Sequence, residues 1–304
     1  MELYQNREIP FTRWIVPNGF LRERMAIVDV GCRGGLLQNW DVLGDLLDLH
    51  SFDPAPDAVE ALRLRDVGRP NRHHYVMAIG DEDGSRAFFV KRDRFGSSLY
   101  RSGDDDLELM VPIRPLDALH REGILSRADF IKIDVESHES AVLRGARMLM
   151  RSSPTIGLEI ETNFNISPNF RATHFAAINE ILVEEGFLVA DLNFDRFPRP
   201  SFAVEAARLG VAGHRVSSFG RSPVTFNFLF CRDFCGESDF PHHYLTAPPP
   251  LAGIEKLVNM LIVFEMYGCL DRAVDLLARF REIFAARFDC DRAAKFLVDQ
   301  DLKK

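Results

Sequence analysis

The sequence lacks the features that mark several classes of protein. Its apolar runs all fall short of the roughly 18 residues that a membrane-spanning helix requires. The net charge is −8, so there is no excess of basic side chains to neutralise nucleic-acid phosphates. The five cysteines are scattered and odd in number, which argues against a disulfide framework. The first 13 residues carry charges throughout, unlike a signal peptide. We therefore expect a cytoplasmic protein with no membrane span and no nucleic-acid partner.

The composition indicates a folded α/β protein. With 304 residues, 46% of them hydrophobic, the chain can form one large domain and an appendage. We predict a lead-in over residues 1–25, a main domain over 26–246 and a helical extension over 247–304. Helical periodicity over 251–267 and 270–284, followed by a third short helix, defines the extension. Its apolar face must pack on the main domain or on a second subunit, so a homo-oligomer is one alternative.

A glycine-rich stretch after an apolar segment is the first candidate ligand site. Residues 26–30 predict a buried strand, and the spacing Asp29-x-Gly31-x-x-x-Gly35 predicts a tight loop and then a helix to about residue 47. A helix N-terminus there would offer unpaired N–H groups to a ligand. The spacing is not G-x-G-x-x-G, and an acidic residue suits the amino group of S-adenosylmethionine better than a pyrophosphate. The alternative is a buried turn that binds nothing.

A second acidic residue follows the next predicted strand. Asp53 ends the segment 49–53, stands before Pro54 and lies about 20 residues after the glycine loop. A carboxylate at this place can accept hydrogen bonds from both ribose hydroxyls of a nucleoside. The alternative is an ordinary aspartate that begins a loop.

Ionisable residues crowd the end of a third apolar strand. Residues 130–135 predict a strand, and Ser137 is a plausible N-cap for a helix through about residue 149. Asp134, Glu136, His138 and Glu139 lie where the strand ends, and ligands bind at that edge of an open α/β sheet. The next predicted strand, 154–160, has Glu159 and Glu161 at its end.

The remaining pattern completes the expected order of elements. Helices are predicted over 56–64 and 173–185 and after Pro115. Strands are predicted over 74–79, 85–90, 187–192 and 224–230, with an edge strand over 111–113. The irregular connection 193–223 is unusually long, which favours a substrate-shaping lid.

Several of these segments together resemble the FkbM family of S-adenosylmethionine-dependent methyltransferases. The most specific block is Lys132-Ile133-Asp134-Val135-Glu136-Ser137-His138-Glu139. The supporting matches, spread over about residues 26–162, are Asp29-Val30-Gly31 with Gly35, Phe52-Asp53-Pro54, Ala78 with Asp81 and Gly84, Ser97-Ser98 and Leu116-Asp117. Two residues depart from the family pattern. Asp53 replaces a glutamate, and Ser137 replaces a glycine, so a positive φ there would cost ~1 kcal/mol.

The resemblance implies a fold, a cofactor and a reaction. The fold would be a Rossmann-like class I methyltransferase sheet, seven-stranded and mostly parallel, with helices on both faces and a C-terminal helical extension. The cofactor would be S-adenosylmethionine, and the reaction O-methylation of a hydroxyl on a sugar, glycan or natural product (EC 2.1.1.-). The residues predicted to contact the cofactor are Asp29, Gly31, Arg33, Gly35, Asp53, Ala78, Ile79 and Asp134.

The predicted catalytic residues are His138, Asp134 and Glu136. Methyl transfer is a direct displacement, so positioning supplies much of the catalysis, and a base must take the proton of an alcohol acceptor. His138 is the candidate base because an ordinary imidazole is largely neutral near pH 7. We predict no dedicated metal site, although Glu136 and Glu159 could instead bind Mg²⁺. Two alternatives to the enzyme remain: a non-catalytic assembly or carrier-binding module with the same fold, and a nucleotide-dependent α/β enzyme such as a dehydrogenase.

Overall fold

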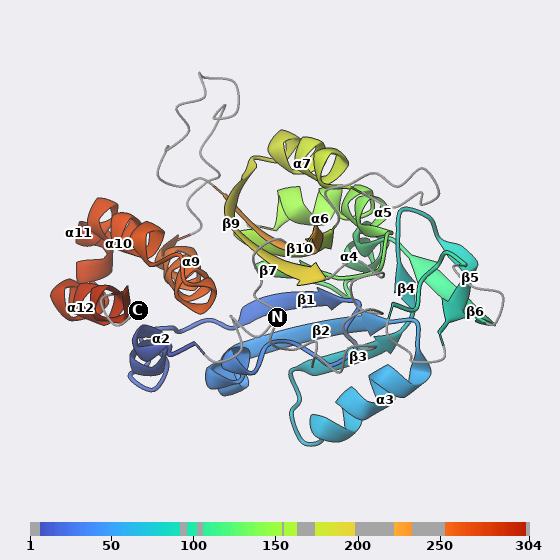
Figure 1. Cartoon of the computed structure of the whole chain (residues 1–304). Helices are drawn as coiled ribbons and strands as arrows, with labels where there is room; N and C mark the ends of the chain where they lie inside the picture. The colour runs from blue at the N-terminus through green and yellow to red at the C-terminus, as the bar shows by residue number, and fades with distance from the viewer. Residues whose placement is uncertain are drawn as a thin grey trace, which may run out of the picture.

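The computed structural model has a seven-stranded sheet at its centre (Figure 1). It describes residues 7–91, 96–101, 106–153, 155–162, 174–197, 222–232 and 253–301. The strand order is β3-β2-β1-β7-β8-β10-β9. The strands are β1 (Met25–Val30), β2 (Leu47–Asp53), β3 (Arg72–Val76), β7 (Phe130–Ile133), β8 (Gly157–Thr162), β9 (Phe187–Phe197) and β10 (Ser222–Arg232).

The five strands from β3 to β8 pair in parallel, and the last two do not. β1 pairs with β2 on one side and β7 on the other, and every residue of β1 and β7 is buried. Continuous burial of this kind is expected for a parallel sheet covered on both faces. β10 runs antiparallel to both β8 and β9. This mostly parallel seven-stranded sheet is the class I methyltransferase architecture that was predicted.

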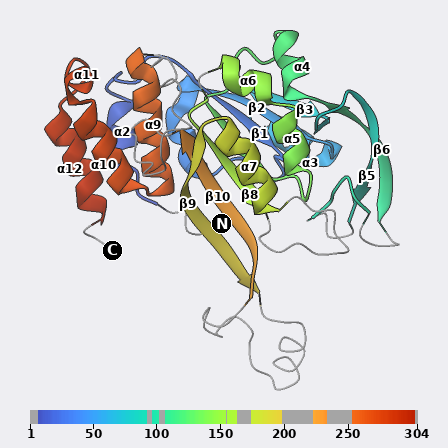
Figure 2. The same cartoon turned by 90° about the horizontal axis from the view of Figure 1, so that it is seen from above.

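β9 and β10 form a hairpin that is longer than the predicted strands. β9 extends to Phe197 and β10 begins at Ser222, and Figure 2 shows the pair projecting from the sheet. The ends of the expected 193–223 connection are thus strand, and the rest of the predicted lid lies outside the described residues.

A small second sheet corrects the prediction for residues 74–79 and 111–113. It has the order β4-β6-β5, from β4 (Ala78–Ile79), β6 (Leu107–Arg114) and β5 (Gly84–Val90). The predicted strand 74–79 is divided between the two sheets: Met77 donates the last bond to β2, through the Asp53 carbonyl (3.2 Å), and Ala78 and Ile79 pair with β6 instead. The predicted edge strand over 111–113 is longer and lies at the centre of the small sheet.

The helix expected directly after the glycine loop is absent from the structure. Residues 38–46 form 3₁₀ turns (η1, Gln38–Leu46), interrupted at Gly44, whose φ is 51°. Glycines lower helix stability, so the apolar periodicity misled the prediction here. The other helices of the domain are α3 (Pro56–Arg65), α4 (Leu116–Arg121), α5 (Glu139–Arg144), α6 (Arg147–Ser152) and α7 (Phe175–Glu184). The helix predicted from Ser137 is thus two short helices, and His138, not Ser137, precedes the first.

The C-terminal helices pack on the main domain together with an N-terminal helix. They are α9 (Gly253–Tyr267), α10 (Leu270–Arg279), α11 (Arg281–Ala285) and α12 (Cys290–Asp301), and they enclose α2 (Pro10–Ile15). Their apolar side chains join those of β1, β2 and η1 in one buried cluster, and Figure 1 shows these helices beside the sheet. No helix among the described residues is both long and apolar enough to cross a membrane.

Glu265 joins these helices from inside the packed region. The side chain is fully buried and accepts hydrogen bonds from the N–H groups of Phe11 (2.8 Å) and Thr12 (2.7 Å) at the start of α2. It also accepts one from the Thr12 hydroxyl (2.6 Å) and one from the Gln300 amide of α12 (2.7 Å). The carboxylate therefore satisfies N–H groups that the first turn of a helix leaves unpaired.

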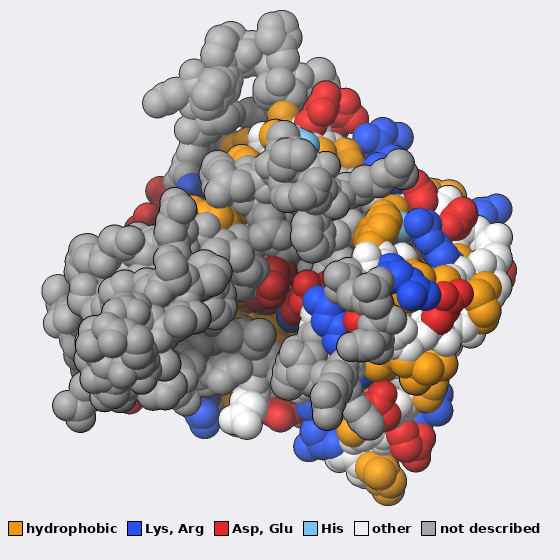
Figure 3. Space-filling model, turned by 45° about the vertical axis from the view of Figure 1, so that its right-hand side comes forward, with side chains coloured by type: hydrophobic (Ala, Val, Ile, Leu, Met, Phe, Trp, Pro, Cys, Tyr) orange, Lys and Arg blue, Asp and Glu red, His pale blue; other side chains and the backbone are white. Residues whose placement is uncertain are grey.

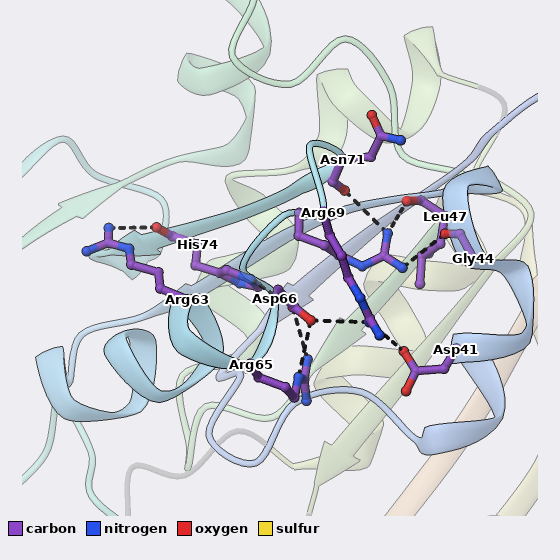
Figure 4. A network of polar contacts seen from close by, with 10 residues as sticks. Asp41, Gly44, Leu47, Arg63, Arg65, Asp66, Arg69, Asn71 and His74 are labelled. Atoms are coloured by element: carbon purple, nitrogen blue, oxygen red, sulfur yellow. Dashed lines mark hydrogen bonds and ion pairs between the residues drawn. The ribbon is translucent and has the colours of Figure 1, made fainter.

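A polar network holds the far edge of the sheet (Figure 4). Asp66, just after α3, accepts hydrogen bonds from Arg65 and Arg69 and lies 3.0 Å from His74 of β3. Arg69 also contacts Asp41 of η1. Asp66 and Asp41 therefore pair with basic side chains of this edge within the fold.

Candidate active site

The glycine loop after β1 packs tightly on the end of β7. Gly31, Gly34 and Gly35 all have positive φ, of 81°, 89° and 77°. A Cβ added to Gly31 would collide with the carbonyl oxygen of Asp134, whereas one added to Gly34 would meet no atom within 4 Å. Gly31 is therefore required for close packing, and Gly34 leaves the backbone open to an approaching molecule.

Asp53 lies beside this loop at the end of β2. The N–H groups of Gly31 and Cys32 bond to the Phe52 carbonyl (2.9 and 3.3 Å), which joins the loop to β2. Asp53 is 5% exposed, and its Oδ1 accepts the N–H of Ala55 (2.8 Å). Burial raises the pKa of Asp53, while that hydrogen bond and the charge of Arg33 oppose the rise. The chain then brings β4, and with it Ala78 and Ile79, next to Asp53.

A row of buried ionisable groups crosses the sheet beneath the loop. Asp29, Lys132 and Glu159 are register partners on β1, β7 and β8. Lys132 Nζ lies 3.7 Å from Asp29 Oδ1 and 3.2 Å from Asp134 Oδ2. Glu159 accepts a 2.5 Å hydrogen bond from the Tyr267 hydroxyl of α9. Lys132 is thus paired with carboxylates on its own strand and on β1.

Burial and the neighbouring charges together set the pKa values of this row. It raises the pKa of Asp29 to about 6, although the charge of Lys132 lowers it. Burial alone would lower the pKa of Lys132, but Asp134, Asp29 and Glu159 raise it above its ordinary value. Among the described residues, neither oxygen of Asp29 accepts a hydrogen bond. Asp29 is fully buried, so it lies behind the loop rather than on its surface.

Three carboxylates meet at the carboxyl edge of the sheet. Oxygen atoms of Asp134, Glu136 and Glu161 all lie within 4.8 Å of one another. We call these three residues the carboxylate cluster. Figure 3 turns this edge toward the viewer and shows Asp and Glu side chains gathered near the middle, beside Lys and Arg. Burial and the neighbouring charges of Asp134 and Glu136 raise the pKa of Glu161 to about 8.

The backbone between β7 and α5 is held in an unusual conformation. Glu136 and Ser137 have positive φ values of 52° and 87°, so the strain expected for serine at the family's glycine position is present. The N–H of Ser137 donates to Glu139 Oε1 (2.9 Å), and the Ser98 hydroxyl donates to the Glu136 carbonyl (2.7 Å). Burial raises the pKa of Glu139 to about 7. These contacts fix the turn that presents Glu136.

His138 lies next to a cavity of about 330 Å³ on the other side of this turn. Its side chain is 3% exposed, its Nδ1 is 3.3 Å from the Tyr100 hydroxyl, and no described residue bonds its Nε2. Burial and the charge of Arg86 lower the pKa of His138 to about 4. The imidazole is therefore neutral at pH 7, as expected from the sequence, but it is a weak base. The residues lining the cavity are Asp81, Arg86, Tyr100, Ser137, His138, Ser140, Ala141, Arg144, His174 and Ala177.

The fold therefore groups the predicted site residues into two sets. In one set, Gly31 bonds to the carbonyl of Phe52, next to Asp53, and β4, with Ala78 and Ile79, contacts β2. In the other, Asp134 and Glu136 meet Glu161 beyond the ends of β7 and β8. Glu159, which we paired with Glu136 as a magnesium ligand, bonds to Tyr267 instead. Glu161 was noted at a strand end but given no role, and adjacent parallel strands bring it to Asp134. Tyr100 was missed because its contact with His138 spans 38 positions.

Comparison with known proteins identifies the family to which the domain with this site belongs. The family model for the methyltransferase FkbM domain matches residues 40–189, about half of the chain. The chain thus carries an FkbM methyltransferase domain with a Rossmann-like, class I sheet, as the sequence predicted. No curated protein matches the chain.

Solved structures with distant similarity include the following three. One is the methyltransferase FkbM from Methylobacillus flagellatus KT, with 17% identity and a TM-score of 0.35 over 75% of this chain. The match spans only half of that protein's chain. Another is the StiE O-MT, with 10% identity, a TM-score of 0.37 and coverage of 74% of both chains. The third is Aeropyrum pernix fibrillarin with bound S-adenosyl-L-methionine, with 11% identity, a TM-score of 0.36 and coverage of 68% and 67%.

Proposed function

We propose that the protein binds S-adenosylmethionine and transfers its methyl group to a hydroxyl of a sugar, glycan or other hydroxylated natural product. The observation that supports this most directly is the position of the carboxylate cluster. It lies at the same sheet edge as the glycine loop, because Gly31 packs on the backbone of Asp134. A cofactor seated on the loop would therefore have proton-accepting groups nearby. The FkbM domain supports the same reaction class.

The residues at the loop fit this cofactor. The open space above Gly34 would let the cofactor approach the backbone of the loop between Gly31 and Gly35. Asp53 would accept hydrogen bonds from the ribose hydroxyls. Ala78 and Ile79 would contact the adenine, and Arg33, Asp29 and Asp134 would set the charge around the remainder. When bound, S-adenosylmethionine supplies an electrophilic methyl group.

Within the cluster, Glu161 is our choice for the group that accepts the proton of the acceptor hydroxyl. A general base works best when its pKa lies near the working pH, and the pKa of Glu161 is raised to about 8. Asp134 and Glu136 would orient the hydroxyl. His138, predicted from the sequence as the base, has a pKa lowered to about 4. In this proposal its imidazole lines the acceptor cavity and positions the substrate.

The same three carboxylates could instead hold Mg²⁺, which prefers oxygen ligands. Their mutual distances, within 4.8 Å, suit a shared cation. The test is methyl transfer after chelation. Loss of activity with EDTA and its recovery with Mg²⁺ would make the cluster a cation site, and unchanged activity would leave it as the base.

The outer parts of the chain have proposed roles as well. We propose that residues 26–246 form the methyltransferase domain, with residues 1–25 and 247–304 as flanking segments that pack on each other through α2, α9 and α12. The acceptor would enter through the cavity beside His138. Self-association through the exposed side of the C-terminal helices is the remaining partner proposal.

Calorimetric titration with S-adenosylmethionine and S-adenosylhomocysteine tests the cofactor. We expect micromolar binding that is lost in Asp53→Ala and retained in Glu60→Ala, an exposed carboxylate on α3. Asp29→Ala, buried below the loop, should weaken binding as well. No binding by folded wild-type protein would contradict the proposal and favour a different nucleotide enzyme.

A panel of hydroxylated acceptors tests the reaction, with release of S-adenosylhomocysteine as the readout. We expect Glu161→Gln to abolish turnover with cofactor binding retained, and the wild-type rate to rise as the pH passes through about 8, where Glu161 loses its proton. His138→Gln should raise KM more than it lowers kcat. If His138→Gln alone abolished kcat, the imidazole would be the base. Cofactor binding without turnover on any acceptor would favour a non-catalytic module.

A further inference from the structure

We propose that Asp48, His50 and His73 bind a divalent zinc-class metal ion on the sheet, away from the candidate active site. Nε2 of His50 lies 3.7 Å from Asp48 Oδ1, and Nε2 of His73 lies 3.8 Å from the same oxygen. The ligand atoms of all three residues fall within 4.8 Å of one another. Two imidazoles and a carboxylate are a donor set that zinc favours.

Strand geometry creates this group without any local motif. Asp48 and His50 are two positions apart on β2, so they face the same side of the sheet. His50 and His73 are register partners on the parallel strands β2 and β3, and their rings stack with centroids 4.6 Å apart. Three donors therefore converge from two adjacent strands on one face of the sheet.

The spacing needs only a small adjustment to close around an ion. Zinc held about 2.0–2.2 Å from each donor would separate the donors by about 3.3–3.6 Å in tetrahedral geometry. The observed separations from Asp48 are only slightly longer. The His73 side chain is 42% exposed, so an ion can enter from solvent and water can complete its coordination.

Tyr75 contacts the ring nitrogen of His50 that would not bind the metal, as partners of metal-binding histidines usually do. Its hydroxyl is 3.4 Å from His50 Nδ1. With the proton on Nδ1, shared with this hydroxyl, the lone pair of Nε2 faces Asp48 and is available to a metal. Tyr75 itself is held by stacking on Phe52, with ring centroids 4.9 Å apart.

The proposed metal group differs in place and chemistry from the carboxylate cluster. Asp48 and His50 lie toward the beginning of β2, whereas Asp53, at the candidate cofactor site, ends it. Among the described residues, these two groups are the ones that bring three or more metal-competent side chains together. Oxygen donors suit Mg²⁺, and imidazoles suit zinc, cobalt and nickel, so the ion preference separates the two groups.

Titration of the chelator-treated full-length protein with Zn²⁺ in excess Mg²⁺ tests the proposal. Magnesium occupies carboxylate sites and leaves imidazole sites free. We expect one equivalent of Zn²⁺ to bind and to raise the melting temperature. His73→Gln, at a half-exposed position that should tolerate substitution, should lose both effects. His120→Gln, a histidine on α4 bonded to the Leu125 carbonyl, is the matched control and should keep them.

Two further measurements make the result decisive. Co²⁺ bound by wild-type protein should give visible absorption bands of a low-coordinate nitrogen and oxygen site, absent in His73→Gln. Tyr75→Phe, which removes a positioning contact, should weaken Zn²⁺ binding about tenfold without changing the stoichiometry. Equal zinc binding by wild type and His73→Gln, or no stoichiometric binding by wild type, would overturn the proposal.

Discussion

Two buried carboxylates, Glu265 between the helices and Asp29 beneath the glycine loop, have opposite surroundings. Glu265 accepts four hydrogen bonds from Phe11, Thr12 and Gln300. Asp29, equally buried, accepts none from the described residues and has only Lys132 at 3.7 Å. A buried charge is costly unless it is paired and hydrogen-bonded. Glu265 is thus a structural group. The carboxylate oxygens of Asp29, by contrast, have no hydrogen-bond donor among the described residues, which agrees with the proposed cofactor site in front of it.

The largest effect is expected at the loop that covers Asp29. Gly31→Ala should destabilise the protein by more than about 4 kcal/mol, because the new Cβ collides with the Asp134 backbone at a positive φ. Gly34→Ala has the same backbone strain but open space, so it should cost only about 1 kcal/mol. Urea unfolding of both variants measures the difference. Equal midpoints would show that the loop does not pack on β7 as described.

An isosteric pair of substitutions tests the two carboxylates themselves. Glu265→Gln should cost about 2–4 kcal/mol, because an amide cannot accept all four hydrogen bonds and leaves buried donors unpaired. Asp29→Asn should cost less, because Asp29 accepts no hydrogen bond from the described residues and Lys132 keeps Asp134 as a closer partner at 3.2 Å. Chemical denaturation at pH 7 measures both. A larger loss for Asp29→Asn would reverse the comparison.

The raised pKa of Glu161 should make the free energy of unfolding depend on pH. The pKa of Glu161 is raised to about 8, so the folded state binds a proton that the unfolded state has already lost above its ordinary pKa of 4.5. Stability from this group is complete below pH 4.5 and is lost as the pH rises through 8. Glu161→Gln should therefore be more stable than wild type at pH 8.5, by on the order of 1–2 kcal/mol, and not at pH 4. Thermal unfolding at the two pH values measures the change, and a pH-independent difference would contradict it.

The smallest effect is expected at Ser137. Its φ is 87°, so Ser137→Gly should raise the free energy of unfolding by about 0.5–1 kcal/mol. Ser85→Gly, on strand β5, should lower it instead, since glycine weakens a strand. Denaturant titration compares the two. A destabilised Ser137→Gly would mean that the hydroxyl contributes more than the strain removes.

The fold was predictable where local pattern and topology agree. Three predicted strands are apolar runs bordered by glycine or acidic residues. The structure ends two of these strands at Val30 and Asp53, as predicted, and the third at Ile133, two residues before the predicted end at Val135. The α-helix expected after Gly35 was wrong: residues 38–46 form 3₁₀ turns, and the positive φ of Gly44 interrupts them. The strand expected over 74–79 is two strands, because β3 ends at Val76 and Ala78 and Ile79 pair with β6 in another sheet.

Much of the site depends on register, which the sequence does not state. Glu161 joins Asp134 because β7 and β8 pair with Lys132 opposite Glu159. His73 joins His50 only through the pairing of β2 with β3. The sequence alone places Asp134 and Glu136 at a strand end. Which residues of the neighbouring strands lie next to them depends on how the strands are aligned.

The contact of Glu265 with α2 has a consequence for synthesis of the chain on the ribosome. Thr12 and Glu265 are 253 positions apart, and a growing polypeptide emerges at about 5–20 residues per second. Glu265 is therefore synthesised on the order of tens of seconds after the segment that forms the first turn of α2. During that interval Phe11 and Ile15, buried in the finished protein, have no C-terminal helices to cover them. The nascent chain should thus depend on chaperones until α9 has been made.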